Sequence, residues 1–167
     1  AYNGSPDELR FTQEKSTDAP EGFANSLKLT VTTAETTLAA DERVRLQQRI
    51  EGQNLQNLKY GTSNAEYLTI SFYVKSNVTG TYGIHLNNAD STRSVCPSYT
   101  IDAANTWEKK TISVAGDTTG TFTNDNGRSL DFCWTLAAGT NYTSGTLATS
   151  WEASTNANEA PSGQPNL

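Results

Sequence analysis

The chain has few of the residues, and none of the motifs, that enzyme active sites commonly use. Its 167 residues include one histidine, two cysteines and no methionine. No Gly-x-Ser-x-Gly motif and no glycine-rich phosphate-binding loop occurs, and nothing in the sequence singles out a Ser-His-Asp triad. The histidine, His85, alternates outward between Ile84 and Leu86, which predicts an ordinary surface residue rather than a catalytic base. We therefore predict a protein that is not an enzyme.

Basic residues and long apolar runs are also scarce. Lys and Arg number 12 against 18 Asp and Glu, which gives a net charge of -6 and an isoelectric point near 4.7. A surface that binds phosphates needs a basic face, so the charge argues against nucleic acid as a partner. No window approaches the apolar length of a membrane span, and the chain does not begin with a signal-peptide pattern. We expect neither a nucleic-acid nor a membrane partner.

The two cysteines, Cys96 and Cys133, do not have the paired spacing of a zinc site. Two interpretations remain, a disulfide or two small buried apolar residues, and the length of the chain favours the second. The segment TNDNG at 123–127 is rich in oxygen ligands and is a candidate structural calcium site, although it does not match the twelve-residue calcium loop. The alternative is a β-turn with Gly127 at a positive φ. No other cofactor is expected.

The two ends of the chain differ in composition from its middle. The chain begins at Ala1 rather than at a methionine, and after Trp151 it runs EASTNANEAPSGQPNL, which is typical of a linker or a long loop. We predict an N-terminal arm over 1–22, a β-sandwich domain over 23–152 and a polar linker or loop over 153–167. We also expect the chain to be an excerpt of a longer protein.

Short alternating strands dominate the middle of the chain. The clearest is YLTISFYVKS at 67–76, in which every second residue, Leu68, Ile70, Phe72 and Val74, is apolar. Similar one-sided patterns occur in six other stretches, near 27–31, 43–51, 82–86, 95–101, 108–114 and 130–136. Strands with one apolar face need a second sheet to cover them. The pattern predicts an all-β protein, an antiparallel β-sandwich with jelly-roll topology as its expected form.

The stretch QQRIEGQNLQNLKYG at 47–61 interrupts this alternation. Asn54 can cap a helix, Leu55 and Leu58 lie three residues apart, and Gly61 can end the turn. We predict one short helical turn near 54–58 that forms a corner of the sandwich. The two leucines are expected to close the open end of the core.

The polar faces of two strands supply the candidate ligand-binding residues Arg45, Gln47, Arg49, Tyr73 and Lys75. If both strands lie in one sheet, these side chains form one patch of planar donors beside an aromatic ring, which is chemistry that suits sugars. The alternative is a solvated sheet face or a subunit contact. Asp131 lies in a strand and is expected to pair with a nearby Lys or Arg. No catalytic residue and no metal ligand is predicted.

Three long segments carry a resemblance to a known module. They are GFANSLKLTVTTAETTLAADE at 22–42, QQRIEGQNLQNLKYGTSNAEYLTISFYVKSNVTGTYGIHLNNADSTRS at 47–94 and YTIDAANTWEKKTISVAGDTTGTFTNDNGRSLDFCWTLAAGTNYTSG at 99–145. Together they resemble a module of structural proteins from marine bacteriophages, found in fibres and other proteins of the virion surface. That module is similar in plan to galactose-binding-like, carbohydrate-binding jelly rolls. It has no residue-level binding motif to carry over.

The resemblance implies a non-enzymatic virion protein, either a tail fibre or a capsid-surface fibre or decoration module. The partners it implies are other virion proteins, further copies of the chain in a homo-oligomer, and host-surface polysaccharide. It places the protein on the surface of an extracellular particle. The alternative is a carbohydrate-binding module of a secreted bacterial glycan-degrading enzyme. A small glycan lyase or hydrolase on the same sandwich is disfavoured because no catalytic constellation is evident.

Overall fold

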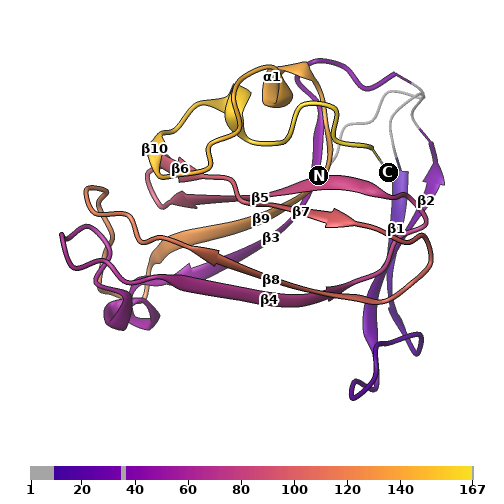
Figure 1. Ribbon diagram of the computed structural model, residues 1–167, viewed down its shortest axis with the longest axis horizontal. Coiled ribbons are helices and arrows are strands. Elements are labelled where there is room, and N and C mark those ends of the chain that lie inside the picture. Colours follow the sequence, from indigo (N-terminus) through magenta and orange to yellow (C-terminus); the bar gives the residue numbers. More distant parts are fainter. Residues whose placement is uncertain (1–9, 35–36, 167) are drawn as a thin grey trace. The chain divides into compact units, whose positions relative to one another are not determined.

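The computed structural model describes residues 10–34 and 37–166, and the chain divides into two compact units (Figure 1). The first unit extends to Leu38, and the second runs from Ala39 to Asn166. The elements are the strands β1 (Arg10–Ser16), β2 (Ser26–Thr33), β3 (Arg43–Glu51), β4 (Leu68–Val74), β5 (Gly80–Asn88), β6 (Arg93–Val95), β7 (Ser98–Ile101), β8 (Glu108–Val114), β9 (Arg128–Ala138) and β10 (Glu152–Ala153), the 3-10 turns η1 (Gly52–Asn54), η2 (Gln56–Leu58) and η3 (Asn156–Asn158), and the short helix α1 (Thr140–Thr143). The all-β prediction is confirmed. No helix in the described ranges has the length and apolarity needed to cross a membrane.

The first unit is a hairpin of β1 and β2, paired antiparallel with Phe11 opposite Val31 and Lys15 opposite Leu27. The predicted arm over 1–22 therefore contains a strand, although residues 1–9 of that arm lie outside the described part of the chain. The predicted boundary of the sandwich at 23 also differs from the structure, because β2 belongs to the hairpin and the sandwich unit begins at Ala39. The sequence did not predict β1, because Phe11 is the one apolar residue in RFTQEKS and the strand therefore shows no alternation.

The second unit contains two antiparallel sheets whose apolar faces meet. One sheet has the order β10-β6-β5-β9-β3, with β7 also paired to β5, and the other consists of β4 and β8. Figure 1 shows β4 and β8 as a layer beside the β5, β9 and β3 layer. A single core cluster joins Ile70 and Val114 of the smaller sheet to Ile84, Leu86 and Leu130 of the larger one, which is the sandwich packing predicted from the alternation.

The corner at 52–58 consists of two consecutive 3-10 turns, η1 and η2, in place of the single helical turn predicted near 54–58. Leu55 is buried in the core cluster and Leu58 packs against it, as expected for residues that close the end of the sandwich. The predicted cap at Asn54 is wrong, because Asn54 is the last residue of η1 and η2 begins without a side-chain cap. The first N–H groups of η1, those of Gly52 and Gln53, donate instead to the backbone carbonyls of Gly127 and Asp125.

The segment 154–166, predicted as part of a linker or loop, is a loop that packs against the outer face of the larger sheet; its position along one side of β5 and β6 is visible in Figure 1. Glu159, Ala160 and Gln164 are buried there. Gln164 accepts a hydrogen bond from Gly83 N at 2.9 Å and donates one to Thr135 O at 3.1 Å. This side chain therefore bridges β5 and β9, so the segment is part of the folded unit and not a free linker.

His85 is only 4% exposed, which corrects the prediction of a surface histidine. It does point away from the inter-sheet core, and it lies directly opposite Cys133 of β9. Cys96 and Cys133 are both buried and free, so the interpretation of two small buried residues is confirmed and the disulfide is not formed. Burial raises the pKa of the Cys96 thiol to about 12, which keeps that thiol protonated and unreactive.

The burial of His85 makes the stability of the unit depend on pH. Burial, followed by the charges of Arg45 and Arg43, lowers the pKa of His85 from 6.5 to about 4. The unfolded chain then binds a proton below pH 6.5 that the folded chain takes up only near pH 4. The free energy of unfolding is expected to be full above pH 6.5 and to fall by up to roughly 3 kcal/mol as the pH drops to 4.

Urea unfolding at pH 7, 5.5 and 4.5 measures this effect, with His85→Leu as the comparison. The variant lacks the titrating ring, so its free energy of unfolding should change less over this range than that of the wild type. Equal losses in both proteins would contradict the assignment of this pH dependence to His85.

The turn at 123–127 was expected either to hold a structural calcium ion or to be a β-turn with Gly127 at a positive φ. Asp125 Oδ1 accepts hydrogen bonds from Gly127 N at 2.9 Å and from the Thr123 hydroxyl at 3.0 Å. Gly127 is not among the glycines with positive φ, so that part of the turn prediction is wrong. Within the described ranges, no group of three or more His, Cys, Asp or Glu side chains is arranged to hold a metal ion.

Candidate functional site

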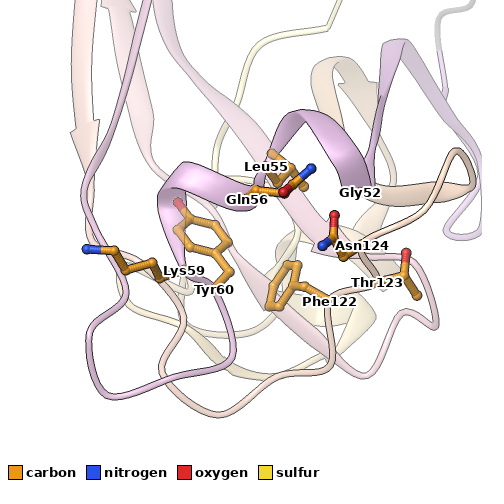
Figure 2. Close-up of a pocket in the computed structure, with 8 residues that line it drawn as sticks. All are labelled: Gly52, Leu55, Gln56, Lys59, Tyr60, Phe122, Thr123 and Asn124. Carbon is orange, nitrogen blue, oxygen red and sulfur yellow. The ribbon is translucent and has the colours of Figure 1, made fainter.

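A pocket of about 300 Å³ opens at the corner of the sandwich, between the two 3-10 turns and the loop that precedes β9. Figure 2 shows its lining, which comes from two segments of the chain. The lining residues are Gly52, Leu55, Gln56, Lys59, Tyr60, Phe122, Thr123 and Asn124. The lining therefore contains two aromatic rings, two side-chain amides, two side-chain hydroxyl groups and a lysine, whose amine points away from the other labelled side chains in Figure 2.

Backbone hydrogen bonds hold the two segments of this site together. Gly52 N donates to Gly127 O at 3.0 Å, Gln53 N donates to Asp125 O at 2.8 Å, and Gly61 N donates to Asp117 O at 2.8 Å. A Cβ at Gly52 would collide with the backbone carbonyl of Thr123, so only glycine allows this approach. The shape of the pocket is therefore set by main-chain contacts and not by mobile side chains alone.

A buried ion pair supports the loop behind the pocket. Arg93 of β6 binds Asp117 through two parallel hydrogen bonds, Nε to Oδ2 at 2.9 Å and Nη2 to Oδ1 at 2.8 Å. Burial raises the pKa of Asp117, but the hydrogen bonds and charge of Arg93, together with hydrogen bonds from the backbone of Thr119 and Gly120, outweigh burial and hold that pKa below its ordinary value. Asp117 is therefore ionised at neutral pH, and its backbone carbonyl presents an acceptor to Gly61.

The two aromatic rings that line the pocket, those of Tyr60 and Phe122, form its aromatic wall and pack against the ring of Trp151. The Tyr60 and Phe122 rings meet edge to face at 5.1 Å, and Trp151 packs against both, at 6.1 Å from Tyr60 and 5.9 Å from Phe122. The Trp151 indole N–H donates to Ala115 O at 2.8 Å, which fixes its orientation. Mutual edge-to-face contacts of this kind favour one arrangement of the rings. The three rings therefore hold one another in a defined arrangement.

The Tyr60 hydroxyl is buried and has no hydrogen-bond partner among the described residues. Burial and then the charge of Asp117 raise the pKa of Tyr60 to about 12, so the hydroxyl keeps its proton at neutral pH. At the mouth of the pocket, the Gln56 amide donates to Gln53 O at 2.9 Å, which leaves its carbonyl oxygen as an acceptor. The Asn124 amide makes no hydrogen bond to any described residue, so it can both donate to and accept from a ligand.

The structure separates the five residues predicted to bind a ligand. Arg45, Gln47 and Arg49 lie on β3, in the larger sheet, whereas Tyr73 lies on β4 in the smaller sheet and Lys75 directly follows that strand. The single patch, which required both strands in one sheet, therefore does not form. Alternation with a period of two predicts on which face of a strand a side chain lies, but it carries no information on which sheet each strand joins.

Four of these residues, all but Arg45, have the following environments in the structure. Gln47 donates to Asp131 Oδ2 at 2.9 Å, and Arg49 Nε lies 4.0 Å from Asp131 Oδ1. Arg128 Nη1 also contacts Asp131 at 3.0 Å, so the predicted pairing of Asp131 with a basic residue is confirmed. Tyr73 is partly exposed, and Lys75 Nζ lies 6.0 Å from the centroid of the Trp107 ring.

Sequence reasoning missed the pocket, although one signal was present. Phe122 is a large aromatic residue between Gly120 and the turn at 123–127, in a stretch with no strand alternation. An apolar ring in such a polar stretch must pack on another segment, which here is the corner carrying Tyr60.

Comparison of the chain with family models, with curated proteins and with solved structures finds no match in any of the three.

Proposed function

We propose that this protein is a non-enzymatic surface module of a bacteriophage particle, in a tail fibre or a capsid-surface fibre or decoration, and that it binds host-surface glycans through the corner pocket. The jelly-roll, galactose-binding-like topology implied by the sequence resemblance is part of this proposal. The pocket takes the place of the strand faces as the binding site. The particle would carry many copies, and their avidity would compensate for weak single sites.

The observation that carries the binding proposal is the pairing of the Phe122 and Tyr60 rings with the Asn124 and Gln56 amides in one pocket. An aromatic ring packs against the C–H face of a sugar, and amides exchange hydrogen bonds with hydroxyl groups. A volume of about 300 Å³ is at the small end of ligand sites, so it suits a single sugar ring. A glycan would therefore place one residue in the pocket and extend into solvent.

Two observations support the non-enzymatic and virion parts of the proposal. The chain's histidine is buried, and both of its ring nitrogens are buried without a hydrogen-bond partner among the described residues, so a dissolved substrate cannot reach them. The virion setting is supported by the resemblance of segments 22–42, 47–94 and 99–145 to the phage module. An electron-microscopy map of the particle that carries this chain tests the setting, since it would show the location and the copy number together.

Ligand-detected NMR with a panel of monosaccharides tests the binding site. Phe122→Ala removes the stacking ring and is expected to weaken binding at least roughly tenfold, as loss of a central aromatic contact does. Asn124→Ala removes one neutral hydrogen-bonding group and should weaken binding roughly three- to tenfold. Far-UV circular dichroism verifies that each variant folds. If Phe122→Ala does not fold, Phe122→Leu replaces it, because leucine removes the aromatic ring and keeps an apolar side chain at this position.

Tyr73→Ala is the matched control, because it also removes a partly exposed aromatic ring, on β4 instead of at the pocket. We expect Tyr73→Ala and Arg49→Ala to bind as the wild type does. Loss of binding in these two variants with full binding in Phe122→Ala would return the site to the strand faces. A wild-type protein that binds none of the sugars would contradict the glycan-binding proposal.

A further inference from the structure

The smaller sheet of the sandwich ends in an unprotected strand edge at β4. β4 pairs with β8 along its whole length, and no strand in the described ranges pairs with its other side. Natural proteins usually protect such an edge with charged residues, proline or a bulge. The sequence of β4, LTISFYV, contains no charge and no proline, whereas β8 contains Glu108, Lys109 and Lys110. A further strand can therefore pair with β4.

Next to this edge, the apolar face of the larger sheet is exposed at β3. The larger sheet has six strands and the smaller sheet has two. β8 lies beside β7, and the Phe72 ring of β4 meets the Trp134 ring of β9 at 5.8 Å, so β4 lies on the β9 side of the smaller sheet. Beyond β9 comes β3, where Leu46 lies directly opposite Trp134 on the same face and is 41% exposed. A strand added to β4 would lie over Leu46 and bury it.

The segment that fills this place must be one layer thick. A strand beside β4 lies above β3, so β3 already takes the place of the second layer beneath it. The β4 strand of a second copy does not fit there, because the larger sheet of that copy would have to occupy the space that β3 fills. An amphipathic hairpin with an uncovered apolar face does fit, because it brings no second layer with it.

The hairpin of β1 and β2 has these properties. β2 contributes Leu27, Leu29 and Val31 to one face, and Phe11 of β1 lies opposite Val31 on that face. Phe11 is 42% exposed and Leu27 is 54% exposed. A two-stranded hairpin is at best marginally stable by itself, so its apolar face needs another surface to pack against. The hairpin and the sandwich are separate compact units of the chain, so the hairpin can serve a different copy.

We infer that copies of this chain associate by exchanging hairpins: β2 of one copy pairs with the free edge of β4 in another, which extends the smaller sheet of the second copy in the order β8-β4-β2-β1. The apolar face of the hairpin then covers Leu46. β2 is the strand next to β4 because its one charged residue is Lys28, whereas β1 carries three. Two copies that exchange hairpins reciprocally form a closed dimer. This assembly does not depend on glycan binding at the corner pocket.

Sedimentation equilibrium over a series of protein concentrations tests the association. The wild type is expected to associate reversibly. Leu27→Gln removes an apolar side chain from the hairpin and should weaken association at least roughly tenfold, as loss of a central apolar contact does. Thr30→Gln places the same side chain on the polar face of the same strand and should associate as the wild type does. Both positions are exposed, so each variant is expected to fold.

The receiving surface is tested with a second pair of variants. Leu46→Gln should weaken association to a similar degree, whereas Arg49→Gln, on the opposite face of β3, should not. Amide hydrogen exchange reports on the strand edge itself. The β4 amides that point away from β8 are expected to exchange more slowly as the concentration rises, because β2 of another copy then accepts their hydrogen bonds.

Three outcomes would overturn the inference. The first is a wild-type chain that stays monomeric at every concentration. The second is association that neither Leu27→Gln nor Leu46→Gln weakens, because the copies would then meet through another surface. The third is association without any slowing of exchange at the β4 amides, because the edge would then remain unpaired. Each of these outcomes leaves the proposed glycan binding in place.

Discussion

Replacing Asp117 by alanine is expected to lower the free energy of unfolding by about 3–5 kcal/mol, the cost of breaking a buried ion pair by removing one partner. The Asp117 side chain has no exposed surface, and that of Arg93 is 24% exposed. Without Asp117, the guanidinium remains in a partly buried site with two of its donors unsatisfied. The substitution also frees the loop whose carbonyl holds Gly61, so the pocket should lose its shape. Urea denaturation followed by tryptophan fluorescence measures the change.

Glu66→Ala is the control for this prediction, because it breaks an ion pair of similar length on the exposed surface of the same unit. Its effect should stay below about 1 kcal/mol. A double-mutant cycle with Arg93→Met separates the pair from its surroundings, and Asp117→Ala should cost far less in the Arg93→Met background. Equal costs of Asp117→Ala in the two backgrounds would show that the pair does not support the loop.

The same pair predicts a loss of stability in acid. Since the pKa of Asp117 lies lower in the folded chain than its ordinary value, its contribution is present at neutral pH and is lost as the pH falls through the folded value, below about 4. The contribution of His85 is lost at higher pH, between 6.5 and 4. The two groups therefore act in successive pH ranges.

Gln164→Ala is expected to destabilise the sandwich unit by roughly 2–5 kcal/mol, because it leaves two buried backbone groups without partners. β5 and β9 pair from Ile84 with Trp134 onward, and Gly83 and Thr135 lie just beyond that last pair, where the strands diverge. The Gln164 amide occupies the gap, accepting from Gly83 N and donating to Thr135 O. Alanine can do neither, and the gap is buried.

Gln164→Glu tests the two halves of this contact separately. A carboxylate can accept from Gly83 N but cannot donate to Thr135 O, so its cost should be substantial even though its shape matches. Gln48→Ala, at an exposed position on β3, is the matched control and should change stability by less than about 0.5 kcal/mol. An unfolding free energy for Gln164→Ala as high as that of Gln48→Ala would show that segment 154–166 does not hold the two strands.

The strand pattern was predictable wherever burial is one-sided. Leu68, Ile70, Phe72 and Val74 alternate with polar residues because one face of β4 meets the larger sheet. The sequence 154–166 carries no such signal, because it is held by individual side chains of Glu159, Gln164 and Asn166 and not by strand pairing. The burial of His85 was missed because alternation places a side chain on one face of a strand but does not show whether that face is covered.

The pocket was beyond sequence reasoning for a different reason. Its lining comes from residues 52–60 and 122–124, and its brace from Trp151, so it depends on contacts between distant parts of the chain. The corner itself was recognised, together with the burial of Leu55. The loop opposite it was interpreted only as a turn, because the alternation that identifies strands is absent there.

The way the chain assembles this site has a consequence for biosynthesis. A growing polypeptide contains residues 52–60 long before Phe122 and Trp151 are made, so the Tyr60 ring gains its ring partners only about 60 to 90 positions later in the chain. The pocket is therefore completed only when translation has passed Trp151. Under the proposed function, a copy truncated before that point would lack the site for glycans.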